Sequence, residues 1–84
     1  METPNSKMFL GDNRYLTHTF INSQTLAYCK YDTLLLSLLV IFHNGSNYEY
    51  SGVDSSTYNE LITATSPGTY FSTVIRKHKY VRVK

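Results

Sequence analysis

The chain has 84 residues, of which 42% are hydrophobic and eight are tyrosines, so it can form one small globular domain and is not disordered. The longest apolar run, residues 34–42, contains a serine and is too short to span a membrane. One cysteine, Cys29, excludes an internal disulfide, and the N-terminus has no signal-peptide pattern. We therefore expect a cytoplasmic, intracellular protein. The net charge of +2 does not by itself identify a partner.

The first part of the chain predicts two strands after a terminal segment without regular secondary structure. Residues 1–6 are polar and include a proline. Within residues 14–21, Tyr, Thr, Thr and Ile at the odd positions alternate with Leu, His and Phe at the even positions, and Thr, Tyr, Ile and Phe favour a pleated strand. After a polar break, residues 25–31 predict a second strand, with the odd-numbered side chains on one face.

Residues 34–50 form the centre of the predicted fold, because an apolar run, an Asn-Gly turn and an alternating return segment predict a β-hairpin. A two-residue turn would pair Ile41 with Tyr48. A three-residue loop with a bulge at Gly45 would instead pair Val40 with Tyr48. We favour the second register, because it gathers the larger apolar set on one face. That set is Leu38, Val40, Phe42, Tyr48 and Tyr50.

Two short helices and a last strand follow the hairpin. A run of N-cap residues offers Asp54, Ser55 or Thr57 as the cap of the first helix. A Ser-Pro-Gly segment ends that helix, residues 69–77 predict a second one, and residues 80–84 alternate as a strand. This order predicts an α+β fold, a small antiparallel β-sheet with two short α-helices packed on one face.

The sequence lacks a catalytic or metal-binding constellation. The histidines His18, His43 and His78 do not have metal-ligand spacing, and Cys29 fits a small core residue better than a nucleophile. The carboxylates fall at turns, caps and exposed faces without pairing, and there is no glycine-rich phosphate loop. We therefore predict neither enzymatic activity nor a metal or cofactor.

Basic residues concentrate near the C-terminus, where five of the eight Lys and Arg residues lie within residues 76–84. Cations beside aromatic rings are typical of phosphate attraction combined with base stacking. The candidate nucleic-acid-binding residues are Arg76, Lys77, Lys79, Tyr80, Arg82 and Lys84. The alternative is a solvated end of the chain, since Lys and Arg are also favourable at a helix C-terminus.

Tyr48 and Tyr50 allow two interpretations. They could present their rings for stacking on bases, as the tyrosines of sheet-based RNA binders do. In the favoured register they share a face with Leu38 and Val40, and we therefore favour a core position for both tyrosines.

Several spaced motifs resemble those of the KTSC domain, which is named from the C-terminus of some lysyl-tRNA synthetases and also occurs in stand-alone proteins of bacteria and phages. The motifs are Phe42-His-Asn-Gly-Ser-x-Tyr48-x-Tyr50, then Val53, Tyr58, Leu61 and Ala64, then Ser66-x-Gly68-x-Tyr70-Phe71, Ile75 and Tyr80. The resemblance covers about residues 23–84, so residues 1–22 form an N-terminal extension. It implies a nucleic-acid-binding role, usually proposed as RNA binding, with residues 76–84 matching the family's basic end.

We therefore expect a non-catalytic domain that binds nucleic acid, and RNA in the first place, through the basic C-terminal segment and nearby tyrosines. Two alternatives stay open. One is a protein-interaction module, such as a phage-encoded inhibitor of a host protein. The other is a small nucleotide-binding protein.

Leu39 and Ile41 alternate with the core positions of the hairpin, so they lie on the opposite face of the sheet, where similar sequences commonly have polar residues. An apolar patch left in water usually marks an interface. We expect the N-terminal extension to pack across this face with the side chains of Met8, Phe9, Leu10, Tyr15, Leu16 and Phe20. A homodimer through the Leu39/Ile41 face is the alternative.

Overall fold

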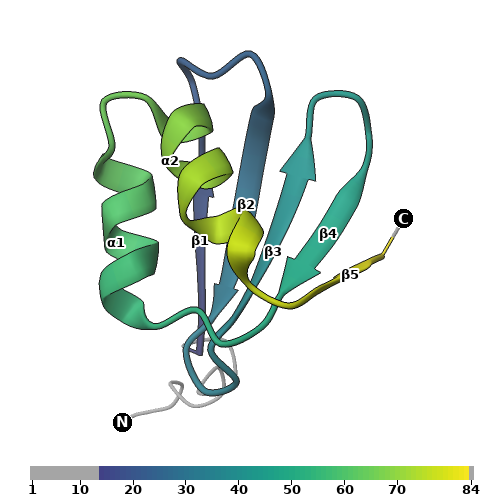
Figure 1. Cartoon of the computed structure of the whole chain (residues 1–84), viewed down its shortest axis with the longest axis vertical. Helices are drawn as coiled ribbons and strands as arrows, with labels where there is room; N and C mark the ends of the chain where they lie inside the picture. The colour runs from purple at the N-terminus through teal and green to yellow at the C-terminus, as the bar shows by residue number, and fades with distance from the viewer. Residues whose placement is uncertain (1–13, 84) are drawn as a thin grey trace, which may run out of the picture.

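The computed structural model describes residues 14–83, which form a five-stranded antiparallel sheet with helices on one face (Figure 1). The strands lie in the order β1-β2-β3-β4-β5. The elements are β1 (Tyr15–Thr19), β2 (Leu26–Asp32), β3 (Ser37–Phe42), β4 (Asn47–Tyr50), α1 (Ser55–Thr63), α2 (Pro67–Thr73), the 3-10 helix η3 (Ile75–Lys77) and β5 (Tyr80–Arg82). After the helices the chain returns to pair β5 with β4. This arrangement confirms the predicted α+β fold.

The β3–β4 hairpin has the register that the three-residue loop predicts. Val40 pairs with Tyr48, and the Phe42 N–H donates to the Ser46 carbonyl at 2.9 Å. Gly45 has a φ of +91°, a conformation that glycine adopts without steric cost. The hairpin therefore places the larger apolar set toward the helices.

The turn between β2 and β3 is longer than the sequence predicts. Residues 34–36 belong to this turn and are exposed, whereas the apolar run predicts that they extend the strand. Asp32 explains the difference, because its Oδ1 accepts the backbone N–H groups of Leu34 at 2.9 Å and Leu35 at 3.0 Å. A carboxylate that accepts N–H groups two and three residues ahead favours a turn over a strand.

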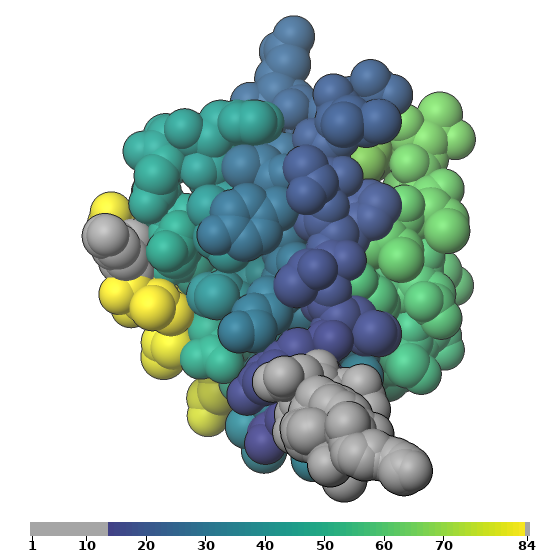
Figure 2. Space-filling view, turned by 180° about the vertical axis from the view of Figure 1, so that it is seen from behind, coloured from purple at the N-terminus to yellow at the C-terminus, as the bar shows by residue number. Residues whose placement is uncertain are grey.

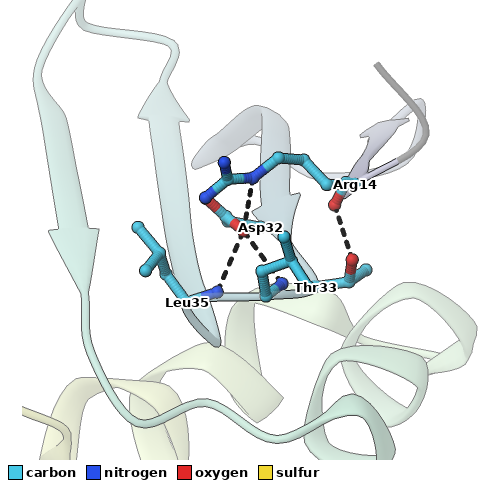
Figure 3. A network of polar contacts seen from close by, with 5 residues as sticks. Arg14, Asp32, Thr33 and Leu35 are labelled. Atoms are coloured by element: carbon cyan, nitrogen blue, oxygen red, sulfur yellow. Dashed lines mark hydrogen bonds and ion pairs between the residues drawn. The ribbon is translucent and has the colours of Figure 1, made fainter. Parts of the chain in front are cut away.

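Asp32 also joins this turn to the residue before β1 (Figure 3). Arg14 donates from Nε and Nη2 to the two carboxylate oxygens of Asp32 at 3.1 and 2.8 Å. The Thr33 N–H and hydroxyl both donate to the Arg14 carbonyl at 2.8 Å. The hydrogen bonds from the Arg14 guanidinium are the main reason why the pKa of Asp32 lies below its ordinary value.

The core lies between the sheet and the helices. The Tyr31 hydroxyl donates to the Val53 carbonyl at 2.6 Å, and its ring stacks on Tyr58 of α1 with centroids 4.6 Å apart. Cys29 is fully buried in β2, as predicted, and this burial raises the pKa of its thiol to about 12. The other buried apolar residues are Phe20, Leu26, Leu38, Val40, Tyr50, Leu61, Phe71 and Ile75.

The two helices begin at residues that suit a helix N-terminus. Asp54 caps α1, since its Oδ1 accepts the Thr57 N–H at 2.9 Å. α2 begins at Pro67, two residues before the predicted start, because a proline fits the first helical position, where its missing N–H is not needed. α2 ends at Thr73 and the chain continues as η3, whereas the sequence predicts one helix through Lys77.

Residues 15–19 extend the sheet as an edge strand, whereas we expected this segment to lie across the sheet. Pairing along β2 satisfies the backbone N–H and C=O groups that the two strands direct toward each other, which a segment crossing a sheet face cannot do. Leu16 pairs with Tyr31 and is exposed, and Phe20 is buried in the core on the helix side. Tyr15 lies on the face opposite the helices, as expected, where it lines a shallow hollow with Lys30 and Leu39. The remaining expected covering residues, Met8, Phe9 and Leu10, lie outside the described residues.

The sheet face opposite the helices, which we call the open face, is seen in Figure 2. Its middle row follows from the strand registers and runs across the sheet as Thr17, Lys30, Leu39, Glu49 and Val81. Leu39 and Ile41 are half-buried on this face, while the Tyr28 side chain is 46% exposed. Within residues 14–83, no helix covers the open face. None of the helices in that range is long and apolar enough to cross a membrane.

Candidate functional site

A groove lies on the helix side of the sheet, between β3–β5 and the segment formed by α2 and η3. It has a volume of about 470 Å³. In Figure 1, α2 and η3 lie in front of β2 and β3, while β4 and β5 extend beyond them. We call this site the aromatic groove, because five of its lining side chains are Phe42, Tyr48, Tyr50, Phe71 and Tyr80.

Three tyrosine rings form one wall of the aromatic groove. Tyr48 and Tyr50 are two residues apart on β4 and therefore share a face. Tyr80 of β5 pairs with Tyr50, and its ring centroid lies 5.6 Å from those of both β4 tyrosines. Phe71 of α2 meets the Tyr50 ring edge-on at 5.4 Å, which fixes the helix against this wall.

The three tyrosines differ in how much of the ring reaches solvent. Tyr80 is 54% exposed, Tyr48 is half-buried and Tyr50 is 4% exposed. Burial raises the pKa of Tyr50, an effect that the nearby Arg76 cation partly offsets. Tyr48 and Tyr80 can therefore offer ring surface to a ligand, while Tyr50 belongs to the core.

The model of the KTSC domain family matches residues 22–80 of the chain. This chain belongs to the KTSC domain family. The crystal structure of a KTSC domain protein from Yersinia pestis has the same fold, with a TM-score of 0.74 and 24% sequence identity. The similarity covers 83% of this chain and 99% of that one. No curated protein matches the sequence.

The second motif of this KTSC domain, Ser66-x-Gly68-x-Tyr70-Phe71, holds the helices together. The Tyr70 hydroxyl donates to Glu60 Oε1 of α1 at 2.7 Å. Burial, followed by this hydrogen bond, raises the pKa of Tyr70 to about 12. Phe71 is buried against Phe42 and Tyr50. Tyr70 and Phe71 of this motif therefore position one side of the aromatic groove.

The fold places only some residues of the predicted basic segment, residues 76–84, at the aromatic groove. Arg76 lines the aromatic groove from η3. Arg82 pairs with Tyr48 across the strands, and its guanidinium carbon lies 5.9 Å from the Tyr48 ring centroid. Lys77 and Lys79 are exposed and do not line the groove, and Lys84 lies outside the described residues.

Four polar residues of the groove were not identified from the sequence: Thr25, Asn44, Ser46 and Ser72. Asn44 Oδ1 accepts the Ser46 N–H at 2.9 Å, so the Asn44 side chain supports the hairpin turn. These residues lie on a loop before β2, on the hairpin turn and on α2. Only the position of the Asn-Gly turn beside the Tyr-x-Tyr motif could have indicated them.

The three histidines lie apart, each with its own contact. The His18 ring meets Phe20 edge-on at 4.9 Å. His43 Nε2 and His78 Nδ1 hydrogen-bond the carbonyls of Ser23 and Ser51 at 3.0 and 3.1 Å. In the part of the chain that the structure describes, no group of three His, Cys, Asp or Glu side chains could hold a metal ion.

Proposed function

We propose that this KTSC domain binds single-stranded RNA in the aromatic groove, without catalysing a reaction. One observation carries the proposal: the exposed ring of Tyr80 and the half-buried ring of Tyr48 lie side by side in an open groove that Arg76 also lines, with Arg82 beside Tyr48. Unpaired bases stack on such rings, and single-stranded RNA offers bases that are free to leave their own stack.

The charges around the groove support the same ligand class. Arg76 is exposed on η3, and Arg82 lies beside Tyr48 on β5. Guanidinium groups attract phosphates and release counterions from the nucleic acid when they bind. Lys77 and Lys79 are exposed next to the groove and add to the positive field without lining it. The proposal therefore assigns phosphate contacts to the arginines and base contacts to the tyrosines.

Titration of a labelled, mixed-sequence single-stranded RNA by fluorescence anisotropy at several salt concentrations tests this function. Arg76→Ala should weaken binding and lower the slope of log Kd against log salt by about 0.7, the value for one phosphate contact on a single strand. Tyr80→Ala should weaken binding by about 1–3 kcal/mol, because one stacked base is lost.

Lys30→Ala is the matched control, since it removes one positive charge from the open face on the other side of the sheet. It should leave the affinity and the salt slope nearly unchanged. Equal losses for Lys30→Ala and Arg76→Ala would show that the attraction is general and does not involve the groove. No binding of RNA by the wild-type protein would reject the proposal.

A single nucleotide is the second candidate ligand for the same groove. The volume of about 470 Å³ is within the range of small-molecule sites, and the aromatic and arginine side chains suit a base and a phosphate. We further propose a cytoplasmic location, which agrees with an RNA ligand and with the free thiol of Cys29.

A further inference from the structure

A second hollow adjoins the aromatic groove. It has a volume of about 490 Å³ and lies between the loop before β2, residues 22–25, and the α2 segment, residues 66–73. Thr25 and Ser72 line both hollows, so that the two form one continuous path beside α2. We call this hollow the hydroxyl groove.

The hydroxyl groove differs from the aromatic groove in its chemistry. Its lining residues are neutral, and most carry a hydroxyl or an amide. Ser23 Oγ accepts the Thr25 and Leu26 N–H groups at 3.2 and 3.0 Å, which fixes one wall. Ser66 and Thr69 are hydrogen-bonded to each other at 2.9 Å on the other wall.

Two hydroxyls at the junction are available to a ligand. Within residues 14–83, the side-chain hydroxyls of Thr25 and Ser72 make no hydrogen bond to the protein, and both residues are exposed. Neutral hydroxyl and amide side chains commonly hydrogen-bond the phosphate and sugar oxygens of nucleic acids. The junction therefore suits the sugar–phosphate link between two nucleotides.

We infer that the ligand is an oligonucleotide that spans both grooves, with a base stacked on Tyr48 and Tyr80 and the neighbouring nucleotide's sugar and phosphate in the hydroxyl groove. This inference rests on the proposed RNA function and selects a short single strand over a single nucleotide. It has a second consequence. Because the lining of the hydroxyl groove carries no Lys or Arg, the additional affinity should come without a steeper salt dependence.

Gly68 offers a variant that acts on the hydroxyl groove alone. It lines that groove and not the aromatic groove, and a Cβ at this position would meet Ser23 Oγ at 4.0 Å, an ordinary contact distance. Gly68→Glu places a carboxylate where a phosphate should lie. Gly68→Gln has nearly the same size without the charge. Both residues are better helix formers than glycine, so the fold should persist.

The experiment measures the Kd of uridine monophosphate and of oligouridylates of two, three and four nucleotides by quenching of tyrosine fluorescence. Uridylates are chosen because they stack weakly on one another. Affinity should rise about tenfold from the monophosphate to the trinucleotide, the factor that one further hydrogen bond to a charged group supplies. The salt slope should not change with this gain. Gly68→Glu should abolish the gain while keeping the monophosphate affinity, and Gly68→Gln should retain most of it.

The possible results distinguish failure of this inference from failure of the proposed RNA function. A monophosphate that binds as tightly as the trinucleotide would overturn the inference and leave the aromatic groove as a nucleotide site. A gain with length that survives Gly68→Glu would also overturn it, because the additional contacts would then lie elsewhere. If no ligand of any length binds, the RNA function itself fails, and the inference fails with it.

Discussion

The residues of the Tyr48-x-Tyr50 motif have different roles although they share a strand face. Tyr50 contacts Phe71 and Tyr80 and is almost completely buried, while Tyr48 lies beside Arg82. The expectation of a core position therefore holds for Tyr50. Tyr48 is half-buried, so it can support the fold and also present ring surface.

Substitution of the two tyrosines by alanine should separate these roles. Tyr50→Ala should lower the free energy of unfolding by about 3–5 kcal/mol, as for other large buried aromatic side chains. Tyr48→Ala should cost only about 1–2 kcal/mol, because part of its ring is already in water. Urea unfolding followed by circular dichroism measures both.

Tyr48→Phe is the control, since it keeps the ring and should keep RNA binding. Equal stability losses for Tyr48→Ala and Tyr50→Ala would contradict this division of roles. RNA binding that is unchanged in Tyr48→Ala would exclude Tyr48 from the stacking surface.

At the scale of elements, the turn after β2 depends on a single ionised side chain. Asp32 accepts hydrogen bonds from Arg14, Leu34 and Leu35, which together lower its pKa, with Arg14 making the largest contribution. A carboxylate with a lowered pKa stabilises the fold above its unfolded-state pKa. That stability is lost as the pH falls through the lower, folded-state value.

Asp32→Asn should therefore reduce stability at neutral pH and weaken the dependence of stability on pH below about 4, the ordinary range for aspartate. Thermal melts between about pH 2 and pH 7 measure the effect. Asp54→Asn is a matched control, because it also removes a carboxylate whose pKa is lowered, in this case chiefly by the hydrogen bond to Thr57. The helix cap is kept, since asparagine can still cap α1. An Asp32→Asn variant with the wild-type dependence of stability on pH would show that ionisation of Asp32 does not stabilise the fold.

The sequence was sufficient to predict elements whose patterns are local. The Asn-Gly turn and the apolar alternation predicted the β3–β4 register, because a slip by one residue would have exposed the core set. The extension of the β2–β3 turn over residues 34–36 was missed, since the apolar residues Leu34–Leu36 resemble a strand until the hydrogen bonds of Asp32 are known. The start of α2 was missed because Pro67 was interpreted as the end of a helix and not as the beginning of the next.

The candidate site was predictable only in part, for a similar reason. The sequence indicated Tyr80 and Arg82 as candidate binding residues, but it did not show that they lie beside Tyr48 and Tyr50. Their positions depend on the pairing of β5 with β4, which are about 30 residues apart along the chain. The contributions of Thr25 and Ser72 depend on packing of α2 against the loop before β2, for which no local pattern exists.

At the scale of the whole molecule, the open face is a feature that the proposed function does not use. It combines half-buried Leu39 and Ile41 with exposed Tyr28 and Val81. Such a face favours an interface. We still expect residues 1–13 to cover it, because they include the apolar residues 8–10 and directly precede the edge strand.

Deletion of residues 1–13 tests this cover and leaves β1 and the buried Phe20 in place. The shortened protein should be less stable or should self-associate through the open face. Light scattering and thermal melts measure these two effects. Ile41→Lys in the shortened protein should restore the monomer, because a charge would then lie in the contact. A shortened protein that stays monomeric and equally stable would show that the face needs no cover.

The burial of Cys29 makes the thiol a chemical reporter of the native core. Burial raises the pKa of this thiol to about 12, so the buried group is almost entirely un-ionised at neutral pH, and only the thiolate reacts with disulfide reagents. The residue lies in β2, between β1 and β3, and its side chain is part of the core between the sheet and the helices, so its sulfur reaches solvent only when that core opens. The rate at which such a reagent modifies the protein is therefore the rate of core opening multiplied by the chance of capture, and no introduced label is needed to measure it.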